Sequence, residues 1–226
     1  MSSRPRVAAV SFLNTKPLIE GLERDVELYL DVPSRLITGL RDGSFDVALL
    51  PVADIPTLAG ATIIARAGGT RGGGIACEGP TLTVRIFSDR PLGSITTLLC
   101  DTDSHTSVNL ARVILRERYG VTPDLRPLPR DAAPHGPCLL IGDKVISAPP
   151  PAPLRAYEAD LGAEWHALTG LPFVFATWLA ADHAPPRRWP VDTALNYFSN
   201  VLRYPLAERE MQAIRLFWLK AGLTPS

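Results

Sequence analysis

Hydrophobic and polar positions along the chain predict an α/β fold. Short apolar or β-branched runs predict buried strands at 6–13, 46–50, 62–65, 74–77, 82–87, 97–100 and 138–141, and 172–180 is a strand or a strand-to-helix passage. Helical spacing of apolar residues predicts helices at 15–22, 34–41, 107–118, 192–201 and 207–219. The stretch 160–169 is a short helix or turn, and the proline-rich stretches 123–137 and 147–153 are expected to be mostly irregular.

Two parts of the chain share one plan: a strand, a polar turn, a helix, and a later strand that ends in a second polar turn. The first part contains VSFLNTKPL (10–18) and DVALLPVAD (46–54), and the second contains CDTDSHTSV (100–108) and CLLIGDKV (138–145). In open α/β sheets, ligands bind outside the carboxyl ends of the strands. Two such sheets facing one another would form a cleft between two lobes.

The turn at 101–107 carries more polar side chains than a helix start requires. One Ser, Thr, Asp or Asn is enough to cap the helix, and the others could be solvated. Alternatively, the backbone N–H groups at the helix start, together with the hydroxyls of Thr106 and Ser107, would hold a carboxylate.

The same choice arises at the first turn. Either Asn14 or Thr15 can cap the helix, and Lys16 can be solvated. Capping leaves Ser11 and one of these two residues unexplained, at the end of a predicted strand. An anion bound here would gain from the helix end and from the ammonium of Lys16.

Composition narrows the class of protein. The formal net charge is zero, so no global field draws the chain to nucleic acid or to an anionic membrane. No apolar run approaches the roughly 18 residues of a membrane span, and the N-terminal apolar stretch is too broken for a signal peptide. We therefore expect a cytoplasmic protein that contacts neither nucleic acid nor membrane.

Residue types that commonly hold metals or nucleotides lack the necessary spacing. The three cysteines have no CxxC pattern and are interpreted as small buried apolar residues, and the four histidines show no metal-ligand spacing. The glycine-rich stretch 67–74 lacks the Lys and Ser or Thr of a phosphate-binding loop. We therefore predict no metal site and no cofactor.

Several stretches, in order along the chain, resemble the menaquinone-biosynthetic chorismate dehydratase family, whose members catalyse the first step of the futalosine route. SFLNTKPL is the most specific of these; the others are DVALLPVAD, GIACEGPTLTVRIFS (74–88), DTDSHTSVNLARVIL (101–115), LLIGD (139–143), DLGAEWHALTGLPFVFATW (160–178) and YFSNVLRY (197–204). The resemblance implies a two-lobed periplasmic-binding-protein-like fold of type II, with a ligand cleft between the lobes. Lobe 1 would comprise 1–83 and 178–226, and lobe 2 would comprise 84–177.

The implied reaction is loss of water from chorismate, which gives 3-[(1-carboxyvinyl)oxy]benzoate and needs neither metal nor redox cofactor. Asn14 matches an Asn regarded as important for catalysis in the family, and Ser11 would assist it from the same turn. Because an amide is a poor base, Asn14 would orient the departing hydroxyl or a substrate carboxylate that takes the proton.

The remaining candidates would bind substrate. One carboxylate would lie at the helix start among the hydroxyls of Ser104, Thr106 and Ser107, with Gly142 and Asp143 lining the cleft and Lys16 as counter-charge. No arginine stands out as partner of the second carboxylate; Arg35 and Arg203 are the candidates. The alternatives are a non-catalytic small-carboxylate binding or sensor module of the same fold and a dihydroxynaphthoate synthase, and the oligomeric state stays open.

Overall fold

The computed structural model describes residues 4–10, 15–31, 33–58, 62–63, 72–101, 104–129, 132–142, 144–180 and 205–223. The chain forms two compact units. Unit 1 comprises Met1–Ala76, Val174–Gln212 and Thr224–Ser226, and unit 2 comprises Cys77–Phe173 and Ala213–Leu223. The lobe boundaries predicted from the sequence, 83/84 and 177/178, lie a few residues later in the chain than the boundaries 76/77 and 173/174 between the two units. The prediction also placed all of the last helix in lobe 1.

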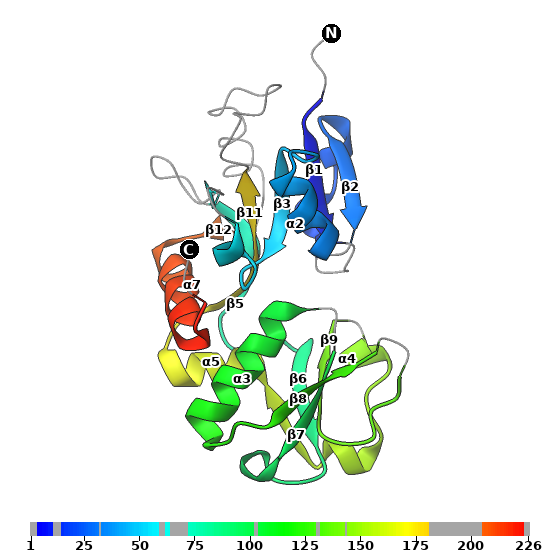
Figure 1. The fold of residues 1–226 in the computed structure, drawn as a ribbon, viewed down its shortest axis with the longest axis vertical. Coiled ribbons are helices and arrows are strands. Elements are labelled where there is room, and N and C mark those ends of the chain that lie inside the picture. The colour runs from blue at the N-terminus through cyan, green and yellow to red at the C-terminus, as the bar shows by residue number, and fades with distance from the viewer. Residues whose placement is uncertain are drawn as a thin grey trace. The chain divides into compact units, whose positions relative to one another are not determined.

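Unit 1 is built on a mixed sheet that has seven strands among the described residues, in the order β12-β5-β11-β3-β1-β2, with β4 also pairing to β11. The strands are β1 (Arg6–Val10), β2 (Glu27–Asp31), β3 (Val47–Pro51), β4 (Thr62–Ile63), β5 (Gly72–Cys77), β11 (Phe173–Ala180) and β12 (Pro205–Leu206). Val7–Val10 of β1 and all of β3 are apolar and buried, as expected for strands covered on both faces. The half-exposed β2 forms one edge (Figure 1).

The helices of unit 1 follow its parallel strands. They are α1 (Lys16–Ile19), α2 (Pro33–Arg41) and the 3₁₀ turns η2 (Leu22–Arg24) and η3 (Ile55–Thr57). The chain leaves α1 at Glu20, and Gly21, with φ of 83°, begins the next 3₁₀ turn. The predicted helix 15–22 is therefore shorter than its apolar spacing indicated.

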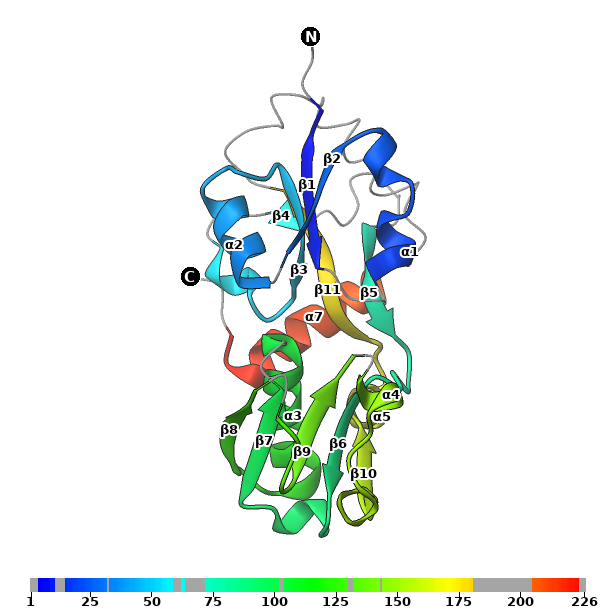
Figure 2. The same ribbon diagram turned by 90° about the vertical axis from the view of Figure 1, so that its right-hand side faces the viewer.

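Unit 2 contains a five-stranded sheet in the order β10-β6-β9-β7-β8 (Figure 2). Its strands are β6 (Val84–Ser88), β7 (Thr97–Asp101), β8 (Asp124–Leu128), β9 (Cys138–Ile141) and β10 (Tyr157–Asp160). Its helices are α3 (His105–Tyr119), α4 (Lys144–Ser147), α5 (Leu161–Thr169), η4 (Leu92–Ser94) and η5 (Ala152–Arg155). α3 and α5 lie on one side of this sheet and α4 lies on the other (Figure 1).

The two sheets repeat one arrangement. In unit 1, β1 pairs in parallel with both β2 and β3, and β11 runs antiparallel to β3. In unit 2, β7 pairs in parallel with both β8 and β9, and β6 runs antiparallel to β9. The shared plan read from the sequence is therefore present in the topology, with β1 and β7 as the central parallel strands.

An aromatic cluster joins the end of the chain to unit 2. Phe217 lies on α7 (Glu208–Ala221). Its ring centroid is 5.1 Å from that of Phe173 and 6.2 Å from that of Trp165, and both ring pairs are edge-on. All three side chains are buried. Lys220 on the same helix forms an ion pair of 2.6 Å with Glu117 of α3. These contacts explain why residues Ala213–Leu223 belong to unit 2. No described helix is both long and apolar enough to cross a membrane.

Candidate functional site

The carboxyl end of β7 carries a fully buried carboxylate. Asp101 is the last residue of the strand, and its side chain is 0% exposed. One of its oxygens, Oδ2, pairs with the ammonium of Lys144, the first residue of α4, and also accepts a long hydrogen bond of 3.4 Å from the N–H of Ile141. Because β7 and β9 are parallel neighbours, this carboxylate ties together the carboxyl ends of both strands.

The start of α3 lies three residues beyond Asp101. Ser104 is its N-cap: the Oγ accepts from the N–H of Ser107 at 3.2 Å and shares a hydrogen bond of 3.0 Å with the Ser107 hydroxyl. Thr106 and Ser107 are 1% and 2% exposed. One cap therefore accounts for Ser104, as the sequence allowed, and two further hydroxyls are buried in the first turn of a 15-residue helix.

The turn after β9 brings Lys144 to this edge. Gly142 adopts φ of 69°, which a residue with a Cβ rarely tolerates, and its N–H donates to the carbonyl of Thr83 at 2.8 Å. The chain can therefore reverse immediately into α4. The Lys144 side chain is 28% exposed. Its ammonium therefore contacts the buried carboxylate of Asp101 and is still accessible to solvent or to a ligand.

The corresponding position in unit 1 lies where β1 ends and α1 begins. Thr15 is completely buried, makes no capping hydrogen bond, and has no hydrogen-bond partner for its hydroxyl among the residues that the structure describes. Lys16 next to it is exposed. Ser11 and Asn14 lie outside the described residues.

The structure therefore gathers part of the predicted site. Ser104, Thr106, Ser107 and Gly142 share the carboxyl edge of the unit 2 sheet, while Lys16 belongs to unit 1, and Asp143 lies outside the described residues. Arg35, considered for the second carboxylate, is exposed on α2 and lies 3.5 Å from Asp31; Arg203 is outside the described residues.

Sequence reasoning missed the Asp101–Lys144 pair. The available signals were an acidic residue at the very end of an apolar strand and one of only three lysines in a chain whose 23 basic residues are otherwise arginines. An arginine-rich composition makes a retained lysine informative, because a compact ammonium and a planar guanidinium are not interchangeable.

Other chemistry is limited in the described part of the chain. Burial raises the pKa of Cys77 and Cys138 to about 12 and that of Cys100 to about 11, so these thiols stay protonated near neutral pH. No group of three or more His, Cys, Asp or Glu side chains that could hold a metal ion occurs among the described residues.

The sequence matches the family model described as menaquinone biosynthesis over residues 5–195. The chain belongs to the menaquinone biosynthesis family. This match covers both polar turns and both strand ends described above, so the residues of the candidate site lie within the part of the chain that defines the family.

Solved structures of low sequence identity share its architecture. Protein AF1704 from Archaeoglobus fulgidus superposes with a TM-score of 0.64 at 11% identity, covering 97% of each chain. The periplasmic aliphatic sulphonate binding protein SsuA from Escherichia coli gives a TM-score of 0.53 at 13% identity, covering 100% of this chain and 81% of SsuA. The predicted two-lobed, periplasmic-binding-protein-like α/β fold of type II is therefore confirmed for this menaquinone biosynthesis protein.

Proposed function

We propose that this menaquinone biosynthesis protein is a chorismate dehydratase, a hydro-lyase that acts in the cytoplasm. The observation that carries the proposal is the carboxyl edge of the unit 2 sheet. There a buried aspartate holds a partly exposed lysine beside the strand end that leads into α3. A helix start and an ammonium are both favourable partners for a carboxylate, and chorismate carries two.

The reaction asks little of the protein beyond positioning. The ring carbon that bears the ether oxygen loses its proton, and the C–H bonding pair forms the new ring double bond. The hydroxyl on the adjacent carbon leaves with the C–O bonding pair, and proton and hydroxide together make water. The ring becomes aromatic without any change of oxidation state that would need an external oxidant. Binding the dianion in one orientation, with the C–H and C–O bonds aligned, supplies much of the rate enhancement.

The proposed roles belong to residues that follow β1, β7 and β9 in the chain. In unit 2, Lys144 and the first turn of α3 bind one carboxylate. In unit 1, Asn14 and Ser11 act at the departing hydroxyl, with Lys16 as counter-charge. The buried hydroxyl of Thr15 adjoins this motif and has no described partner, which supports a role in the same turn.

The direct test is to incubate the purified protein with chorismate, without added metal or nucleotide, and follow products by chromatography. We expect 3-[(1-carboxyvinyl)oxy]benzoate to accumulate, and Asn14→Ala to lose most turnover while it remains folded. Saturable chorismate binding with no product at high protein concentration would favour the non-catalytic binding module instead.

The binding residues have their own test. Lys144→Met should raise KM at least tenfold, because a hydrogen bond to a charged group contributes about 1.5–3 kcal/mol. Thr106→Val and Ser107→Ala should also act mainly on KM, which each should raise. The matched control is Lys220→Met, which removes a lysine that pairs with Glu117 instead. An unchanged KM in the Lys144 variant would exclude this lysine from the substrate site.

A further inference from the structure

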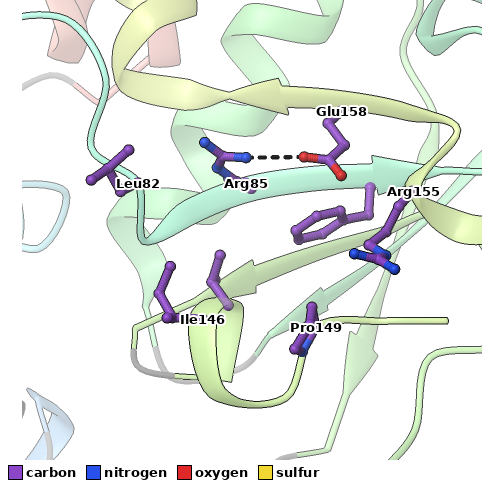
Figure 3. A pocket seen from close by; sticks show the side chains of 8 residues that line it. Leu82, Arg85, Ile146, Pro149, Arg155 and Glu158 are labelled. Atoms are coloured by element: carbon purple, nitrogen blue, oxygen red, sulfur yellow. Dashed lines mark hydrogen bonds and ion pairs between the residues drawn. The ribbon is translucent and has the colours of Figure 1, made fainter. Parts of the chain in front are cut away.

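Unit 2 contains a pocket that the proposed reaction does not use. Its volume is about 290 Å³, near the lower limit for small-molecule sites. It lies beside α4, which supplies Val145 and Ile146 to its lining. The residues that line it come from the start of β6, from α4 and the loop after it, from η5 and from β10: Leu82, Arg85, Phe87, Val145, Ile146, Pro149, Arg155 and Glu158 (Figure 3).

Much of the pocket wall is apolar. Phe87 and Val145 are buried and form its floor as part of the core beneath α4, whereas Ile146 and Leu82 are 66% and 56% exposed. Large apolar side chains left in water at one place indicate a binding surface. Leu82 and Ile146 lie at one end of the pocket (Figure 3).

The exposure of Leu82 is fixed by its backbone. Leu82 has φ of 64°, the one positive value for a non-glycine residue in the described part of the chain. Its N–H donates to Oδ2 of Asp160 at 2.7 Å, and the neighbouring Thr81 N–H donates to Oδ1 at 2.9 Å. A left-handed backbone at a branched side chain costs on the order of 1 kcal/mol, so this aspartate holds an apolar side chain at the pocket rim against a conformational cost.

The charged groups that line the pocket favour an anion. Arg85 and Glu158 neutralise one another through an ion pair of 2.9 Å, and Arg85 Nε also lies 3.7 Å from Asp160 Oδ2. Arg155 lies across the pocket from Leu82 and Ile146 (Figure 3), and its guanidinium has no ion pair or hydrogen bond among the residues that the structure describes. The lining groups, two cationic and one anionic, thus leave one positive charge.

We propose that this pocket binds a small organic anion: one apolar ring or short chain that lies against Leu82, Ile146 and Phe87, with a single carboxylate or sulfonate on Arg155. The site goes beyond the proposed dehydratase activity. None of its lining residues is among those assigned to chorismate, so loss of the pocket should leave chorismate turnover intact.

The test uses 8-anilinonaphthalene-1-sulfonate, an apolar fluorescent anion, as the probe. We expect 3-phenylpropionate to displace it at concentrations about tenfold below those at which the neutral 3-phenylpropanol does, because a charge-assisted hydrogen bond distinguishes the two. Arg155→Gln should abolish that preference, and Ile146→Asp should weaken probe binding at least tenfold. Thermal unfolding confirms that each variant is folded.

Two matched variants serve as controls. Arg126→Gln removes an exposed arginine on β8, the opposite edge strand, and Leu219→Asp removes an apolar side chain that is 71% exposed on α7. Neither should change probe binding. Equal displacement by acid and alcohol, or probe binding unaffected by Arg155→Gln and Ile146→Asp, overturns the proposal. So does a wild-type dimer that Ile146→Asp dissociates, since the face would then be a subunit interface. A protein inactive on chorismate that still shows the expected probe behaviour would refute the dehydratase function alone.

Discussion

Asp160 is expected to be among the most sensitive polar positions of unit 2, because four backbone N–H groups donate to its carboxylate. Gly162 and Ala163, at the start of α5, donate to Oδ1 at 3.0 and 3.2 Å. Thr81 donates to the same oxygen at 2.9 Å, and Leu82 donates to Oδ2 at 2.7 Å. One side chain thereby caps a helix and fixes a segment some eighty residues earlier in the sequence.

The size of the effect follows from these bonds. Loss of a helix N-cap costs about 0.5–2 kcal/mol. The two bonds to the 81–82 segment are partly solvated, so we assign each about 1 kcal/mol, the usual net value of a hydrogen bond. Asp160→Ala should therefore lower the free energy of unfolding by roughly 2.5–4 kcal/mol. Asp160→Asn, which keeps one acceptor oxygen, should lose about half of that.

Urea unfolding followed by tryptophan fluorescence and circular dichroism measures these differences, and thermal unfolding should show the same ranking of variants. Asp89→Ala is the control, since Asp89 is an exposed carboxylate of the same unit that pairs with its neighbour Arg90. It should cost under about 0.5 kcal/mol. If Asp160→Ala were no more destabilising than Asp89→Ala, the bridging role of this carboxylate would be refuted.

Three further predictions concern the core and the strand-end cluster. Lys144→Met should destabilise unit 2 more than Asp101→Asn in urea unfolding, because it takes the cation from a fully buried carboxylate; the reverse order would contradict the pairing. Phe217→Ala should cost about 3–5 kcal/mol, measured in the same way, since it empties a site between two aromatic rings. The three cysteines should be alkylated far more slowly in the native than in the unfolded protein at pH 8. Their pKa values of about 11 to 12, against 9.0 for a free thiol, lower the thiolate fraction roughly 100- to 1,000-fold. Because the folded thiols hold their protons to higher pH than the unfolded ones, stability should also decline as the pH rises above about 9.

The sequence predicted the buried strands well and failed at the edges of the sheets. The apolar run 138–141 coincides with β9, and the long helix 107–118 lies within α3. The prediction overlooked β2, β8 and β10, and all three are strands at sheet edges with mostly exposed side chains. An edge strand buries too little to show hydrophobic alternation, and it tolerates proline, such as Pro127 in β8. The stretch 123–137, which was predicted to be mostly irregular, contains β8 at Asp124–Leu128.

The candidate site was predictable only where one segment carried the signal. Ser104 was recognisable as a possible cap because capping depends on neighbours within three residues. The pairing of Asp101 with Lys144 depends instead on the register of β7 against β9, which apolar periodicity does not specify. The same holds for Asp160 and Leu82, which meet only after β10 has paired with β6. The predicted helix 192–201 lies outside the described residues.

The aromatic cluster around Phe217 has a consequence for biosynthesis. Trp165 and Phe173 leave the ribosome well before α7, so the nascent unit 2 exposes two large rings until the last helix arrives. At about 5–20 residues per second this interval lasts several seconds, long enough for a chaperone to engage the rings. A chain truncated before Ala213 would lack Phe217 and would never complete this cluster. Such a product should be degraded by proteases and should not accumulate as a folded fragment.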